Sequence, residues 1–203
     1  MITFLENIAD RLLNKFPHNM EDVAIVLPSK RAVVFFKHYL SKRIKQPIFL
    51  PGFYSIEEFI EDLSGFQVLD NISLQFRLYK TYLRYPPKKQ DSFDDFLKWS
   101  NILIHDFNEI DRNLVDAASI YTNLSHVKEL DDWSVNDWSF SESELTPMQS
   151  NYLSFFQEMF NWYNNFTQSL LAEKLAYQGL AYKQAAQNIE SIGLKWKQVW
   201  FVG

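Results

Sequence analysis

The apolar residues in the first third of the chain follow two different periods. Between residues 4 and 16 they recur every three or four positions, as on one face of a helix, whereas 23–27 is a short continuous apolar run. Such a run is typical of a strand buried on both faces in a parallel sheet. Ser29 is then placed to cap a helix, whose apolar stripe is Val33, Phe36, Leu40 and Ile44.

A second strand and a third helix are predicted next. Residues 47–50 form another short apolar run, followed by Pro51 and Gly52. The sequence Ser55-Ile-Glu-Glu58 has the spacing of a capping box, which predicts a helix from there to about Leu63. The order helix, strand, helix, strand, helix indicates an α/β fold.

Helical periods dominate the chain from Gly65 onward. Thr146, Pro147 and Gln149 combine a capping residue, a first-turn proline and a capping-box partner, so a helix should begin there. An apolar run at 199–202 predicts a final strand. The elements expected in this part are helices at 72–85, 93–109 and 114–124, an acidic surface connection at 131–144, helices at 146–177 and 181–191, and the strand at 199–202.

These elements predict a division of the chain. Residues 1–65 and 181–203 should form one parallel-sheet core, and residues 66–180 a mainly α-helical insertion between its two halves. A parallel strand is normally followed by a connection to the next element, so we expect the polypeptide to continue beyond Gly203.

Composition narrows the possible chemistry. The chain has 203 residues, 47% of them hydrophobic, and no cysteine. The lack of cysteine excludes disulfides, thiol nucleophiles and cysteine-ligated zinc, and it fits a reducing compartment. Glu6 and Asp10 interrupt the first apolar pattern, which is therefore neither a signal peptide nor a membrane span. We expect a cytoplasmic protein with no membrane partner.

Charge is distributed unevenly along the sequence. The net charge is −5, yet residues 28–45 carry six lysines and arginines and no acid, while residues 91–144 are strongly acidic. An anionic polymer should therefore meet the early segment and avoid the middle of the chain.

The predicted helix after Ser29 has a cationic face opposite its apolar stripe. Two interpretations remain open: a solvated outer face, or a surface that contacts the phosphates of a nucleic acid with help from the free N–H groups at the helix N-terminus. The candidate DNA-binding residues are Ser29, Lys30, Arg31, His38, Lys42 and Lys45.

A second group of polar residues could bind a divalent metal. His105 and Glu109 would share a helix face, with Asp106 nearby. We favour a simpler interpretation, in which Asp106 or Glu109 pairs with a cation and Asp111 caps a helix starting near Asn113.

Several catalytic patterns are missing from the sequence. No glycine precedes Gly52, so no glycine-rich loop follows the first strand, and ATP binding by a Walker-type loop is not expected. The final strand carries no acid to hold magnesium. No lysine has an acid two positions before it, as a PD-(D/E)XK nuclease site requires, and no serine nucleophile elbow is present. We therefore expect no catalytic residues and no cofactor in this segment.

Several short motifs in a fixed order resemble the N-terminal region of AddB-like proteins, which are relatives or partners of RecB-type helicase-nucleases and end in a PD-(D/E)XK domain. They are AIVLPSKRAVVFF, FLPGFYSIEEFI, LIHDFNEIDRNLVDA, LTPMQ and YQGLAYKQAA leading into VWFVG, and the resemblance extends over essentially the whole chain. The resemblance implies a superfamily 1 helicase-like core of the P-loop NTPase class that lacks the P-loop.

The resemblance also implies a function. The segment VLPSKRA resembles the helicase motif that touches the DNA backbone, which would give Ser29, Lys30 and Arg31 that role. We therefore expect a non-catalytic DNA-binding scaffold in a larger nuclease that repairs double-strand breaks, with an AddA-like helicase-nuclease subunit as a possible partner. Mg²⁺ would belong only to a nuclease domain outside this segment. The alternative is a protein-interaction module that docks a partner subunit through the acidic helical insertion.

Overall fold

The chain divides into two compact units. The computed structural model describes residues 2–87, 90–123 and 147–203, the last with side chains from residue 158 onward. Unit 1 comprises Met1–Gly65 and Ala185–Gly203, and unit 2 comprises Phe66–Gln184. The division expected from the sequence falls after residues 65 and 180.

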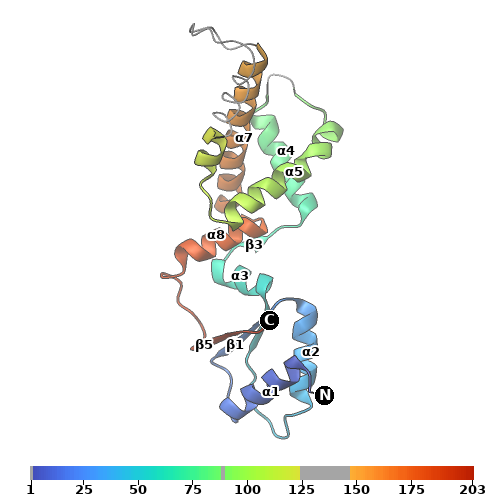
Figure 1. Ribbon diagram of the computed structural model, residues 1–203, viewed down its shortest axis with the longest axis vertical. Coiled ribbons are helices and arrows are strands. Elements are labelled where there is room, and N and C mark those ends of the chain that lie inside the picture. Colours follow the sequence, from blue (N-terminus) through green and yellow to red (C-terminus); the bar gives the residue numbers. More distant parts are fainter. Residues whose placement is uncertain (1, 88–89, 124–146) are drawn as a thin grey trace, which may run out of the picture. The chain divides into compact units, whose positions relative to one another are not determined.

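Unit 1 is an α/β unit built on a small parallel sheet (Figure 1). The strand order is β2-β1-β5, and β1 pairs in parallel with both neighbours, Ile25 lying opposite Phe53 on one side and Trp200 on the other. Its elements are α1 (Phe4–Lys15), β1 (Val23–Leu27), α2 (Lys30–Ser41), β2 (Gly52–Ser55), α3 (Ile56–Ser64) and β5 (Gln198–Phe201).

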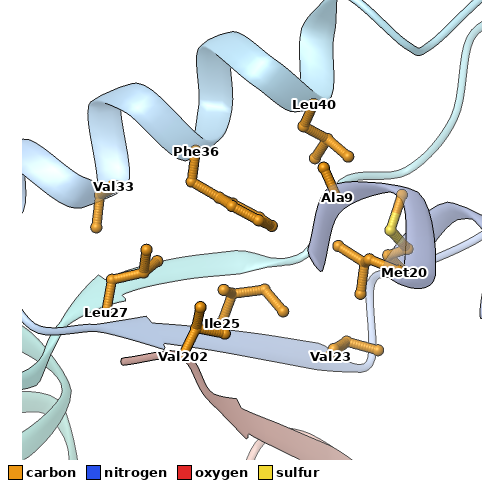
Figure 2. Packing of buried hydrophobic residues seen from close by; sticks show 10 residues of the cluster. Ala9, Met20, Val23, Ile25, Leu27, Val33, Phe36, Leu40 and Val202 are labelled. Carbon is orange, nitrogen blue, oxygen red and sulfur yellow. The ribbon is translucent and has the colours of Figure 1, made fainter. Parts of the chain in front are cut away.

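The core of unit 1 lies between one face of β1 and the helices α1 and α2. Figure 2 shows Val33, Phe36 and Leu40 reaching from α2 toward Ile25 and Leu27. All five residues of β1 are buried, as its continuous apolar run predicts. Each large apolar side chain buried here contributes about 1.5–3 kcal/mol relative to an exposed one.

An aromatic cluster forms the other side of the sheet. Phe59 of α3 lies 5.7 Å from Phe201 and 5.6 Å from Trp196, between ring centroids. Tyr54 of β2 lies 5.1 Å from Trp196 in an edge-on arrangement. Each such pair stabilises the fold by about 0.5–1.5 kcal/mol beyond the contribution of the apolar area that it buries.

The second strand does not lie where the sequence predicted it. Residues 47–50 make only an isolated bridge between Asn19 and Phe49, and β2 begins later, at Gly52. Pro47 and Pro51 carry no N–H for a ladder. At Gly52 a Cβ would lie 2.8 Å from the Tyr54 ring, so any larger residue would have to displace this ring.

Local capping fixes the helices of unit 1. The predicted capping box at Ser55 and Glu58 is present, and α3 ends at Gly65, whose φ of 72° suits glycine. A second capping box, formed by Thr3 and Glu6, starts α1. The predicted helices at 4–16 and 56–63 are confirmed.

Unit 2 is mainly helical. It contains β3 (Gln67–Val68), α4 (Asn71–Arg84), α5 (Phe93–Arg112), a short helical stretch at 117–123, α7 (Pro147–Ala172), β4 (Leu175–Ala176) and the first residues of α8 (Gln178–Asn188). Rings from α4, α5 and α7 meet in its interior, where Tyr82 lies 5.0 Å from Phe96 and 5.3 Å from Trp162.

Some boundaries in unit 2 differ from the prediction. α7 begins at Pro147 as predicted but ends at Ala172, and Lys174 then takes a φ of 59° before β4. The parallel pair β3-β4 is not visible in the sequence, because two residues a strand are too few to show a period. The capping role of Thr146 and the connection at 131–144 lie outside the described residues.

In the described ranges, no helix combines the length and the apolar content needed to cross a bilayer.

Candidate nucleic-acid interface

Helix α2 has one face in the core and one face in solvent. The side chain of Ser29 accepts a hydrogen bond from the Ala32 N–H at 3.3 Å, which confirms the predicted cap. Because Val33, Phe36 and Leu40 pack inward, the opposite face of the helix points away from the sheet (Figure 2).

Two cations of the basic segment have structural roles. The guanidinium of Arg43 donates to Asp10 of α1 at 2.6 Å and lies 3.7 Å from Glu6, so it ties α1 to the end of α2. The hydrogen bond with Asp10 raises the pKa of Arg43. Lys37 places its ammonium 5.0 Å from the centre of the Phe53 ring.

At the N-terminus of α2, where the sequence predicted a phosphate contact, Lys30 forms an ion pair with a carboxylate. Glu58 lies 3.3 Å from the Lys30 ammonium, and its other oxygen accepts from the Ser55 N–H at 3.0 Å. This backbone hydrogen bond is the main cause that lowers the pKa of Glu58, and Lys30 adds to it. The Lys30 side chain is 70% exposed, so the pair is worth little and can open. Lys30 is nevertheless the weakest of the candidate cations.

The remaining candidate cations are free of acidic partners. Arg31, His38, Lys42 and Lys45 are exposed, and within the described part of the chain no carboxylate lies within 4.0 Å of their charged groups. These four residues, together with the exposed Val34 and Phe35, are called the α2 outer face below.

The α2 outer face differs from the prediction in two ways. The helix ends at Ser41, so Lys42 is its cap and Lys45 lies in the following loop, not on the helix. At this end of the helix the Leu40 carbonyl accepts from the N–H groups of both Arg43 and Ile44. The face also includes Val34, 65% exposed, and Phe35, 50% exposed. Their positions outside the 33, 36, 40 stripe are the signal in the sequence, but neither residue was among the predicted site residues.

The possible metal group on α5 consists of exposed side chains. His105 lies 3.8 Å from Asp106, and Glu109 lies 3.9 Å from Arg112 on the next turn. Across residues 2–87, 90–123 and 147–203, no three histidine or acidic side chains are grouped closely enough to hold a metal ion. The contact of Glu109 with Arg112 agrees with the simpler interpretation.

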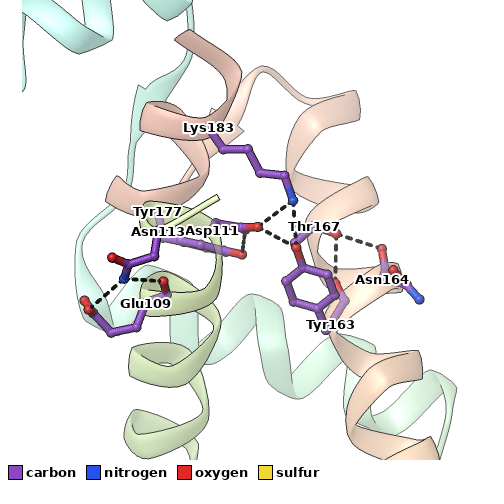
Figure 3. Close-up of polar contacts among 8 residues, drawn as sticks. All are labelled: Glu109, Asp111, Asn113, Tyr163, Asn164, Thr167, Tyr177 and Lys183. Carbon is purple, nitrogen blue, oxygen red and sulfur yellow. Dashed lines mark hydrogen bonds and ion pairs between the residues drawn. The ribbon is translucent and has the colours of Figure 1, made fainter. Parts of the chain in front are cut away.

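The predicted capping role of Asp111 is wrong. Asp111 lies inside α5 with a fully buried side chain, whereas Asp116 caps the stretch at 117–123 by accepting from the Ser119 N–H at 2.9 Å. Figure 3 shows Asp111 accepting from the hydroxyls of Tyr163 and Tyr177 and from the Lys183 ammonium, the last at 2.8 Å.

Burial dominates the electrostatics around Asp111. It raises the pKa of both Tyr163 and Tyr177, and the negative Asp111 raises them further by disfavouring a second anion beside it. Both phenols therefore remain neutral donors at physiological pH, and Lys183 supplies the compensating charge. The network joins three helices and is closed to any substrate, so it is structural.

Comparison of the chain with protein-family models, curated proteins and solved structures finds no match. The resemblance to AddB-like proteins therefore stays a prediction.

Proposed function

We propose that this chain is a non-catalytic DNA-binding scaffold with a helicase-like fold, acting within a larger nuclease that repairs double-strand breaks. The observation that carries the proposal is the α2 outer face, where an exposed aromatic ring occurs together with four cationic or titratable groups that have no acidic partner among the described residues. This combination suits a strand of DNA, because cations contact phosphates while rings stack on unpaired bases.

The exposed ring of Phe35 favours single-stranded DNA over duplex DNA as the ligand. The Phe35 side chain is 50% exposed and lies between Arg31 and His38 on the helix surface. Stacking of a base on an aromatic side chain is worth about 1–3 kcal/mol and needs a base that is not already stacked in a duplex. Single-stranded DNA should therefore bind more tightly than the same sequence as a duplex.

The connection from β1 to α2 supports a scaffold and not a nucleotide site. It consists of Pro28 and Ser29 alone, and a Cβ on Gly203, which follows β5, would lie 3.3 Å from the Pro28 ring. A phosphate cradle needs several consecutive free N–H groups. Proline has none, and the Ser29 hydroxyl is already used by the cap. In this proposal Mg²⁺ belongs to a nuclease domain elsewhere, and an AddA-like subunit is the partner.

The charge contribution can be tested by salt titration. With a fluorescent single-stranded oligonucleotide and the full 203-residue chain, the logarithm of the binding constant should fall with the logarithm of salt concentration, with a slope of about −2 to −3. The triple variant R31Q/K42Q/K45Q should bind at least about tenfold more weakly and reduce the slope by about 2.

A matched variant controls for net charge. Lys98, Lys195 and Lys197 are exposed lysines outside the α2 outer face, and K98Q/K195Q/K197Q removes the same charge. This variant should keep most of the affinity. Equal losses in the two triple variants, or equal binding of single and double strands, would refute the proposal.

A further inference from the structure

Helix α4 has two apolar faces. On the first, Leu74, Leu78 and Tyr82 are buried inside unit 2. The second remains exposed in the described part of the chain, and its residues recur at helical spacings of four, three and four positions. They are Ile72 (66% exposed), Phe76 (53% exposed), the half-buried Tyr79 and Leu83 (44% exposed). These four residues are called the α4 outer stripe below.

The α4 outer stripe forms a preset apolar surface, although the solvent side of a helix is normally polar. At 1.5 Å per residue it is about 16 Å long, or about three helical turns. Phe93 of α5 widens it, because its ring stacks on Phe76 with centroids 5.3 Å apart and lies 4.8 Å from Tyr79. Tyr79 also lies 5.0 Å from the buried Phe96. These rings are therefore held in position before any ligand binds.

The side of the stripe next to α5 is occupied by groups that already have partners. Asn71 and Gln75 of α4 both donate to the Asn101 side-chain oxygen, each at 2.8 Å. The acids at the start of α5 belong to this side as well, and one of them, Asp95, pairs with Lys98 at 2.6 Å. This side therefore offers no free cation to a ligand.

The opposite side of the stripe is cationic. Lys80 and Arg84 are exposed and lie one turn apart, and among the described residues no carboxylate lies within 4.0 Å of their charged groups. Glu173 is already paired with Arg77 at 2.9 Å. The hydrogen bond from Arg77 is the main cause that lowers the pKa of Glu173, and Lys80 adds a smaller effect. Residues 71–90 contain no acid, and the two that the structure does not describe are lysines.

We infer that the α4 outer stripe binds an acidic amphipathic helix of a partner protein. The apolar face of such a helix packs on the stripe, while carboxylates along one of its edges pair with Lys80 and Arg84. Because only one side of the stripe is cationic, the charge also selects the direction in which the partner helix lies. The sequence alternative placed partner docking in the acidic part of the insertion, whereas this surface is apolar and cationic.

Two other ligands match the stripe less well. A nucleic acid needs rings on which its bases stack, and the aliphatic Ile72 and Leu83 at the two ends of the stripe offer none. A lipid surface attracts helices whose polar face is rich in cations, whereas here cations border one side only. The site lies in unit 2, so it goes beyond the DNA contact proposed for α2.

The test uses the full chain and two fluorescent peptides that are held helical by a hydrocarbon staple. Both carry leucine at positions i, i+4, i+7 and i+11, with two glutamates along one edge of this stripe in the first peptide and two lysines there in the second. In fluorescence anisotropy the glutamate peptide should bind saturably. The lysine peptide should bind at least about tenfold more weakly, because two attractive ion pairs become two repulsive ones.

Protein variants separate the two parts of the surface. K80E/R84E should reverse the preference and bind the lysine peptide more tightly, a result that misfolding cannot produce. I72S/L83S should bind the glutamate peptide at least about tenfold more weakly, because it removes the apolar ends of the stripe. I102S/I189S removes two aliphatic side chains of similar exposure outside the stripe, and it should leave binding unchanged.

Three outcomes of the peptide experiment would overturn the inference: no saturable binding of the glutamate peptide, equal binding of the two peptides, or unchanged binding in I72S/L83S. A dimer in sedimentation equilibrium that I72S/L83S dissociates would instead assign the stripe to a second copy of the chain. Binding of an oligonucleotide or of phosphatidylglycerol vesicles that K80E/R84E abolishes, without binding of the glutamate peptide, would assign it to phosphates. R31Q/K42Q/K45Q should bind the glutamate peptide like the wild type, so either proposal can fail while the other holds.

Discussion

Asp111 shows how a single buried charge is made tolerable. Its carboxylate is removed from water, yet it receives three donors: two hydroxyls and one ammonium. An ionised group without such partners would cost several kcal/mol. These donors come from α7, from the residue after β4 and from α8, so the network fixes the end of α5 against three other segments of unit 2.

We expect D111N to destabilise the protein by about 3 kcal/mol, because it leaves Lys183 without its counter-charge and gives the amide donors that face other donors. Chemical denaturation monitored by tryptophan fluorescence measures the loss. D94N, which removes an exposed charge from α5, is the control and should change the free energy of unfolding by less than about 0.5 kcal/mol. A D111N protein as stable as the control would show that the network contributes nothing.

Capping decides where the elements of unit 1 begin. Ser55 is fully buried, and its hydroxyl accepts a hydrogen bond from the Glu58 N–H at 3.2 Å. In return, the Glu58 carboxylate accepts a hydrogen bond from the Ser55 N–H. S55A should therefore lower the free energy of unfolding by about 1 kcal/mol at pH 7.

The same capping box predicts a pH effect. The pKa of Glu58 in the folded chain lies below its usual 4.5, chiefly because of the hydrogen bond from the Ser55 backbone. The contribution of the Glu58 carboxylate to the free energy of unfolding is therefore fully present above the usual pKa of 4.5. It is lost as the pH falls through the lower pKa of the folded chain. E58Q should be less stable than the wild type at pH 7, and this difference should become smaller at pH 3 in denaturation curves. A constant difference between the two pH values would contradict this.

The sequence predicted those elements whose signals are local. Ser29 and Ser55 cap their helices through residues three positions away, and the continuous run at 23–27 reveals a strand covered on both sides. The location of β2 was predicted wrongly, because pairing with β1 and the close approach at Gly52 decide it. Neither of these features is visible in a window of neighbouring residues.

The candidate site was predictable only in part, for the same reason. The exposed cations of α2 follow from helix geometry, but the pairing of Lys30 with Glu58 does not, since the two residues lie in different helices. Asp111 was misinterpreted because its partners lie 52, 66 and 72 positions away.

Across the whole molecule, the sheet of unit 1 depends on both ends of the described chain. Strand β1 pairs with β2 on one edge and with β5, more than 170 positions later, on the other. A chain shortened to residues 1–190 should lose the cooperative unfolding of unit 1, because β1 then has a bare edge and the aromatic cluster lacks Trp196 and Phe201. Unit 2 retains its helices and its internal aromatic contacts.

Hydrogen exchange measures this difference unit by unit. Amides of β1 and α2 should exchange at least about a hundredfold faster in the shortened chain, whereas amides of α4 and α5 keep their protection. Loss of protection in both units would show that the two fold as one.

The position of β5 at the end of the described chain also affects the order in which the two units can fold during synthesis. Ribosomes build a chain from its N-terminus, so β1 and β2 emerge early while the partner for the second edge of β1 is still untranslated. Unit 2 is continuous in sequence and can fold completely during that interval. Throughout it, the nascent protein carries an open strand edge of five apolar residues, the kind of surface that chaperones protect and that pairs wrongly when it is left uncovered.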